Sequence, residues 1–118
     1  YFFAIAKIRN PASINWKSPF VFVGKTDEEL SLVALESEVP SDAYPVDRGY
    51  RMMRVAGTLD MSLTGILARI SKVLSDEEIP IFAVSTYNTD YILVKSHTFK
   101  NAVQALSRAG YLVTNEIS

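Results

Sequence analysis

Residues 60–74 have the sequence DMSLTGILARISKVL, which contains the clearest structural pattern in the chain. Its apolar side chains recur every three or four residues, the spacing that places them on one face of an α-helix. They are Leu63, Ile66, Leu67, Ile70, Val73 and Leu74. Asp60 or Ser62 can cap the helix by accepting an unpaired amide of its first turn. Because Pro80 cannot continue a helix, the segment predicts an amphipathic helix that ends before residue 80.

The segments around this helix alternate between strand and helix patterns. Strands are predicted over residues 50–55, 80–85, 91–95 and 111–114. A second helix is predicted over residues 99–106, with Thr98 at its start and Gly110 just past its end. The order βαββαβ predicts an α+β, ferredoxin-like fold. In that fold an antiparallel sheet has both helices on one face, and we expect the strand of residues 50–55 at its centre.

The first 49 residues contain strand patterns more clearly than helix patterns. Strands are predicted over residues 2–8, 20–25 and 30–35. Residues 26–29 (TDEE) form a polar turn between the last two strands, and residues 40–49 are expected to be a linker. A shortened version of the same unit fits this order. We therefore predict a degenerate unit over residues 1–49, ahead of a complete domain over residues 50–118.

The composition excludes several classes of function. The chain has 12 Lys and Arg against 13 Asp and Glu, a net charge of −1, whereas nucleic-acid binders present a basic face. It has no Cys and one His, which removes disulfides, thiol catalysis and most zinc sites. No apolar run approaches the ~18 residues that span a bilayer. We expect a cytoplasmic protein with no cofactor, no bound metal, and neither nucleic acid nor membrane as its partner.

Residues 63–70 (LTGILARI) and 79–94 (IPIFAVSTYNTDYILV) resemble the ACT domain. More specifically, they are similar to small bacterial tandem-ACT proteins related to the CASTOR arginine sensors, as are residues 20–22 (FVF) and 26–33 (TDEELSLV). The resemblance implies two ACT-like units side by side, no catalytic residues, and an amino acid bound at ACT interfaces. Aspartate kinases have related ACT modules as regulatory tails, which gives a second context for this one.

The junction between the first strand and the helix can bind an anion. The first amides of a helix have no partner within it, and the helix dipole adds partial positive charge there. A ligand carboxylate can accept these amides, Gly65 lets it approach the backbone, and Ser62 and Thr64 add hydroxyls. The same residues also fit a purely structural role, in which Ser62 only caps the helix and Gly65 only allows close packing of helix on sheet.

The turn between the two strands of the hairpin offers the complementary charge. Asp90 can pair with a ligand ammonium, so that carboxylate and ammonium together describe an amino acid. The alternative is that Asn88 and Asp90 are ordinary hairpin-turn residues. The candidate ligand-binding residues are Asp60, Ser62, Leu63, Thr64, Gly65, Ile66, Thr86, Tyr87, Asn88 and Asp90. The arginine sensors have an acid at the position of Leu63, so the resemblance implies a neutral ligand side chain here.

These observations predict an amino-acid sensor or regulatory module that assembles as a homodimer. An enzyme needs a nucleophile or base with an orienting partner, and the one histidine, His97, has no such partner in the sequence. We therefore expect no catalytic residues. Two alternatives remain open: a dimerisation or interaction module that binds no ligand, and a regulatory ACT partner of an amino-acid biosynthetic enzyme such as aspartate kinase.

Overall fold

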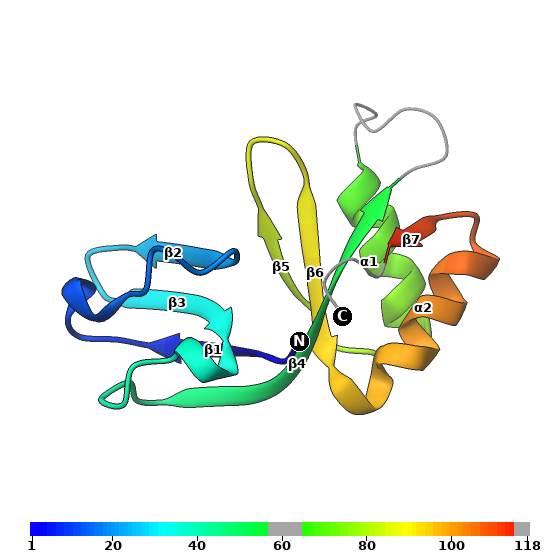
Figure 1. Ribbon diagram of the computed structural model, residues 1–118. Coiled ribbons are helices and arrows are strands. Elements are labelled where there is room, and N and C mark those ends of the chain that lie inside the picture. The colour runs from blue at the N-terminus through cyan, green and yellow to red at the C-terminus, as the bar shows by residue number, and fades with distance from the viewer. Residues whose placement is uncertain (57–64, 115–118) are drawn as a thin grey trace. The chain divides into compact units, whose positions relative to one another are not determined.

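Strands dominate the part of the chain that the structure describes. The computed structural model describes residues 1–56 and 65–114, and the chain divides into two compact units, Tyr1–Tyr50 and Arg51–Ser118 (Figure 1). The first unit contains β1 (Phe3–Lys7), η1 (Pro11–Ser13), β2 (Val21–Lys25), β3 (Leu30–Leu35) and η2 (Glu36–Glu38), where η marks a single 3-10 turn. β4 (Val46–Ala56) begins in the first unit and ends in the second. The second unit continues with α1 (Ile66–Asp76), β5 (Phe82–Ser85), β6 (Asp90–Lys95), η3 (Ser96–Thr98), α2 (Phe99–Arg108) and β7 (Leu112–Thr114).

The strands of the first unit follow the order β2-β3-β1-β4, and each neighbouring pair is antiparallel. The 3-10 turns η1 and η2 stand where a βαββαβ unit has its helices. One cluster of buried residues consists of Ile8, Ile14, Leu32 and Ala34. The prediction of a linker up to residue 49 is wrong, because Val46 and Asp47 pair with β1 and extend the sheet.

The second unit has the strand order β7-β4-β6-β5, with α1 and α2 on one face (Figure 1). Strand alternation turns Met53, Ile92 and Val94 toward the helices, where they meet apolar residues of both. The buried cluster between the sheet and the helices consists of Met53, Ile70, Leu74, Ile79, Ile92, Val94, Ala102, Ala105 and Leu106. The predicted α+β, ferredoxin-like fold with β4 in the centre is confirmed.

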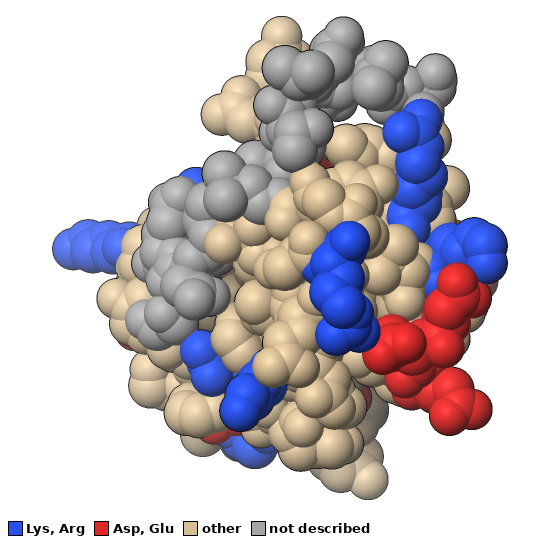
Figure 2. Space-filling view, turned by 90° about the vertical axis from the view of Figure 1, so that its right-hand side faces the viewer, with Lys and Arg blue, Asp and Glu red and all other residues tan. Residues whose placement is uncertain are grey.

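The outer faces of the helices are charged. Basic side chains are spread over this side of the molecule, and acidic ones gather at one edge of it (Figure 2). Lys72 Nζ lies 3.1 Å from Asp76 Oδ2, and Arg108 pairs with Glu77 at 3.4 Å. Exposed pairs of this kind contribute about 0–1 kcal/mol each, so the helices are held by their apolar faces.

Both helices end in the same hydrogen-bond pattern. In α2 the Tyr111 amide donates to the Leu106 carbonyl at 3.0 Å, and Gly110 has the left-handed φ of 93° that this ending requires. The predicted Gly110 ending is confirmed. In α1 the Ile79 amide donates to the Leu74 carbonyl at 3.0 Å, but the left-handed position is held by Glu78, with φ 58°. A side chain in that conformation costs about 1–2 kcal/mol.

Candidate functional site

The start of α1 is the first part of the candidate site. The helix begins at Ile66, so that Gly65, not Asp60 or Ser62, occupies the N-cap position. The predicted side-chain cap is therefore wrong. Gly65 is exposed and has φ 80°, a left-handed conformation that favours glycine. Among residues 1–56 and 65–114, a Cβ added at Gly65 would meet no heavy atom within 4 Å, so close packing against these residues does not explain this glycine.

Gly65 is exposed, whereas the side chain of Ile66 packs against the core of the second unit. The Arg69 amide donates to the Gly65 carbonyl at 3.0 Å as the first bond of the helix. The amides of residues 66–68, which come before Arg69, have no acceptor within the helix and mark its electropositive end. Ile66 is half-buried and packs against the core of the second unit. The predicted site residues Asp60, Ser62, Leu63 and Thr64 lie outside the described residues.

The turn between β5 and β6 is closed largely by its own threonines. The Thr86 amide donates to the Thr89 carbonyl at 2.8 Å, and the Thr86 hydroxyl donates to the same oxygen at 3.0 Å. Tyr87 and Asn88 are exposed at the tip of the turn. Thr86 therefore has a structural role that accounts for its presence without a ligand.

Asp90 is the first residue of β6 and is half-buried. The Ser85 hydroxyl donates to Asp90 Oδ1 at 2.5 Å, and Oδ2 has no hydrogen-bond partner within residues 1–56 and 65–114. This bond fixes the carboxylate at the base of the turn. Figure 1 shows the turn and the start of α1 at the same end of the second unit. The carboxylate of Asp90 and the open backbone at Gly65 thus belong to one end of one domain.

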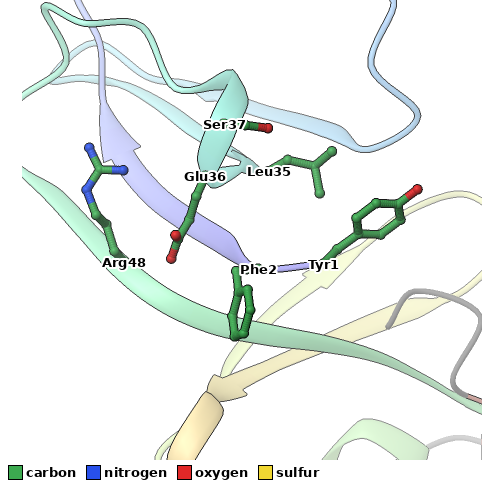
Figure 3. Close-up of a pocket in the computed structure, with 6 residues that line it drawn as sticks. All are labelled: Tyr1, Phe2, Leu35, Glu36, Ser37 and Arg48. Carbon is green, nitrogen blue, oxygen red and sulfur yellow. The ribbon is translucent and has the colours of Figure 1, made fainter.

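A cavity in the first unit was not predicted from the sequence. It has a volume of about 500 Å³, within the range of small-molecule sites. The lining residues are Tyr1, Phe2, Leu35, Glu36, Ser37 and Arg48 (Figure 3). The pairing of Phe3 with Leu35 brings the start of β1 beside the end of β3, and residue 48 comes from β4. No local sequence pattern predicts such a site, because its residues come from three separate segments.

Other classes of site are not seen in the described residues. Within residues 1–56 and 65–114, no three His, Cys, Asp or Glu side chains are grouped so that they could hold a metal ion. In the same ranges, neither helix is long and apolar enough to cross a membrane. His97 is exposed in η3.

The fold of the chain recurs in solved structures, three of which are described below. A crystal structure of a protein from Agobacterium tumefaciens has 33% identity and a TM-score of 0.79, over 92% of this chain and 83% of that one. A Vibrio cholerae protein of unknown function, described as a possible transport protein, has 15% identity and a TM-score of 0.73, over 91% and 82% of the two chains. Aspartate kinase from Clostridium acetobutylicum has 16% identity and a TM-score of 0.68, over 92% of this chain and 32% of the kinase.

The sequence comparison gives the family. No curated protein matches the chain. The profile of the ACT domain matches residues 46–108, which include β4, both helices and the hairpin between them. That match spans more than half of the 118 residues, and the strand order and helix placement of the second unit agree with it. The chain belongs to the ACT-domain family.

Proposed function

We propose that this chain is a regulatory module that binds an amino acid at the start of α1, without catalysing a reaction. ACT domains are generally regulatory modules that bind small molecules. The observation that supports this site is Gly65: an exposed, left-handed residue with open space beside it, directly before the helix. The helix amides and dipole there favour a ligand carboxylate.

Asp90 is the proposed partner of the ligand ammonium. Its carboxylate is half-buried and positioned by Ser85, so little side-chain freedom is lost when it binds a cation. A charge-assisted hydrogen bond to a positioned carboxylate is stronger than one to a neutral acceptor. In this proposal Ser62 and Thr64 add hydroxyls to the carboxylate site, and Thr86, Tyr87 and Asn88 belong to the ligand-binding residues across from it.

The proposed ligand has a neutral side chain. Leu63 occupies the position at which the arginine sensors that this chain resembles have an acidic residue. A guanidinium beside leucine would leave donors unpaired, at a cost of roughly 1–3 kcal/mol. That cost corresponds to about tenfold to a hundredfold weaker binding, whereas an apolar side chain would lose nothing there.

Calorimetric titration of leucine and arginine tests this proposal, after a thermal-shift panel of amino acids and nucleotides has identified binders. Leucine should bind at least about tenfold more tightly than arginine. Asp90→Asn keeps the acceptor for Ser85 but removes the charge, and should weaken leucine binding about tenfold. The matched control, Asp27→Asn, changes an exposed turn carboxylate of the other hairpin and should leave binding unchanged. Tighter binding of arginine, or an unaffected Asp90→Asn, would refute the proposed site.

The first unit is, in this proposal, a shortened ACT-like unit, as in tandem-ACT proteins. Its strand order β2-β3-β1-β4 corresponds strand for strand to β5-β6-β4-β7 of the second unit. β3 and β6 start sixty positions apart, at Leu30 and Asp90, and a 3-10 turn follows each. Equal order and equal spacing support a common origin of the two units.

The proposed assembly is a homodimer acting in the cytoplasm. β5 stands at one end of the strand order. Charged residues and prolines usually protect an edge strand from pairing with another chain, and Phe82–Ser85 contains neither. Phe82 is 37% exposed on it. Sedimentation at micromolar concentration should give a dimer of the 13.1 kDa chain. A monomer would refute the assembly, and a dimer without any ligand in the thermal-shift panel would favour a pure interaction module.

A further inference from the structure

We infer that the cavity of the first unit is a second ligand site, separate from the start of α1, and that it takes a small zwitterion with an apolar group. The cavity has a volume of about 500 Å³, and its lining includes two side chains of opposite charge, Glu36 and Arg48. The aromatic rings of Tyr1 and Phe2 and the side chain of Leu35 supply apolar surface beside them (Figure 3).

Glu36 is held in place by the backbone on both of its sides. Its Oε2 accepts the Gly49 amide at 2.6 Å, and its own amide donates to the Phe2 carbonyl at 2.9 Å. The side chain is half-buried, and Figure 3 shows it between those of Arg48 and Phe2. A positioned, partly desolvated carboxylate binds an ammonium more strongly than a mobile one at the surface.

The charge pattern selects for a dipolar ligand. A guanidinium such as that of Arg48 can bind a carboxylate in a bidentate manner, and the Ser37 hydroxyl can donate to the same group. A plain anion would meet the charge of Glu36, and a plain cation that of Arg48. A molecule with both charges and an apolar group matches the whole lining, because its carboxylate can bind Arg48 while its ammonium binds Glu36.

The site is particular to the first unit. Sixty residues further on, the positions of Leu35, Glu36 and Ser37 are occupied by Lys95, Ser96 and His97. The 3-10 turn is the same, η2 in one unit and η3 in the other, but the acid is absent from the second. The inference is therefore independent of the proposed site at Gly65, which lies in the other unit.

Amide NMR of the full chain tests the inference, with the Gly49 resonance as the reporter, because this amide donates to Glu36. The probe is phenylalanine, compared with 3-phenylpropionate, which lacks the ammonium, and 2-phenylethylamine, which lacks the carboxylate. Phenylalanine should shift the Gly49 resonance saturably at millimolar concentration or below. Each singly charged analogue should bind at this resonance about tenfold or more weakly, since one charge partner is missing.

Two variants and two controls complete the test. Glu36→Gln retains an acceptor for Gly49 and Arg48→Gln changes an exposed residue, so both should fold; each should weaken binding about tenfold or more. Glu28→Gln and Lys25→Gln change exposed charges of the β2–β3 hairpin and should not affect it. The inference would be overturned if the Gly49 resonance did not respond to phenylalanine. It would also be overturned if either analogue bound as tightly as phenylalanine, or if both pocket variants bound phenylalanine like the wild type. A response at Gly65 alone would overturn it while supporting the proposed function.

Discussion

The two units of this chain build the same strand arrangement with and without helices. Their hairpins close in the same way: the Thr26 amide donates to the Glu29 carbonyl at 2.9 Å, and the Thr86 amide to the Thr89 carbonyl at 2.8 Å. In the second unit, two helices cover one face of the sheet, whereas the first unit has single 3-10 turns in their place. Strand pairing and turn chemistry are therefore sufficient for this topology, and the helices add something else.

What the helices add is buried apolar surface. Among the described residues, eleven buried hydrophobic residues lie in the second unit and nine in the first, and α1 and α2 supply five of the eleven. Burial of apolar side chains is the dominant favourable term in folding. The cluster that packs against the helices should accordingly contribute more stability than the smaller cluster around Leu32, a difference that substitutions in each can measure.

The largest expected effect is loss of a helix anchor. Leu106 of α2 is fully buried, and Leu32 of β3 is 1% exposed in the smaller cluster with Ile8 and Ile14. Leu106→Ala should lower the free energy of unfolding by about 3–5 kcal/mol, and Leu32→Ala by about 2–3 kcal/mol, because a smaller core collapses more easily around a cavity. Urea unfolding measures both. A larger loss for Leu32→Ala would contradict the comparison of the two cores.

A second pair of substitutions compares two glycines. Gly65→Val forces a β-branched side chain into φ 80° and should cost about 1–3 kcal/mol, although nothing crowds the position. Gly24 lies in β2, also with open space beside it, so Gly24→Val should be neutral or stabilise by up to about 1 kcal/mol. If thermal unfolding gave the same change in stability for Gly65→Val and Gly24→Val, the backbone conformation would not explain why residue 65 is a glycine. Gly65→Val is therefore a poor probe of ligand binding, because it also strains the start of α1.

A smaller effect is expected at the ends of the helices that only the second unit has. Glu78→Gly should stabilise by roughly 0.5–1 kcal/mol, since it removes the cost of a side chain at φ 58° and this gain exceeds the added freedom of the unfolded chain. Gly110→Ala should destabilise by about 1 kcal/mol for the opposite reason. Differential scanning calorimetry would give both signs. Destabilisation by Glu78→Gly would mean that its side chain makes a stabilising contact larger than the backbone cost.

The smallest effect concerns the last residue of the first unit. Burial, the hydrogen bond of the Tyr50 hydroxyl to Asp47 Oδ2 at 2.7 Å and the charge of Asp47 raise the pKa of Tyr50 from 10.0 to about 12. The folded state thus favours the protonated phenol, so this contribution is complete below pH 10 and is lost as the pH rises toward 12. Relative to Tyr50→Phe, the wild type should lose stability over this range. A constant difference between the two proteins from pH 9 to 11 would refute the assignment.

Much of the fold could be predicted from the sequence, because period and turn chemistry are local. The helical period over residues 66–74 and the alternation of the hairpin strands both correspond to observed elements, whereas Leu63 lies outside the described residues. The N-cap was misplaced because Asp60 and Ser62 match the preference for capping oxygens, while the left-handed conformation of Gly65 leaves no such trace in a pattern. The cavity around Glu36 could not be predicted either, since its lining depends on which strands pair.

A leucine titration followed by amide NMR would establish whether the helix start of the second unit is the amino-acid site. The largest shifts should occur at Gly65, Ile66 and Leu67, with smaller ones at the β5–β6 turn. These shifts should saturate together, and Asp90→Asn should weaken the response about tenfold. No shift at Gly65, Ile66 and Leu67 at millimolar leucine would contradict this placement of the site.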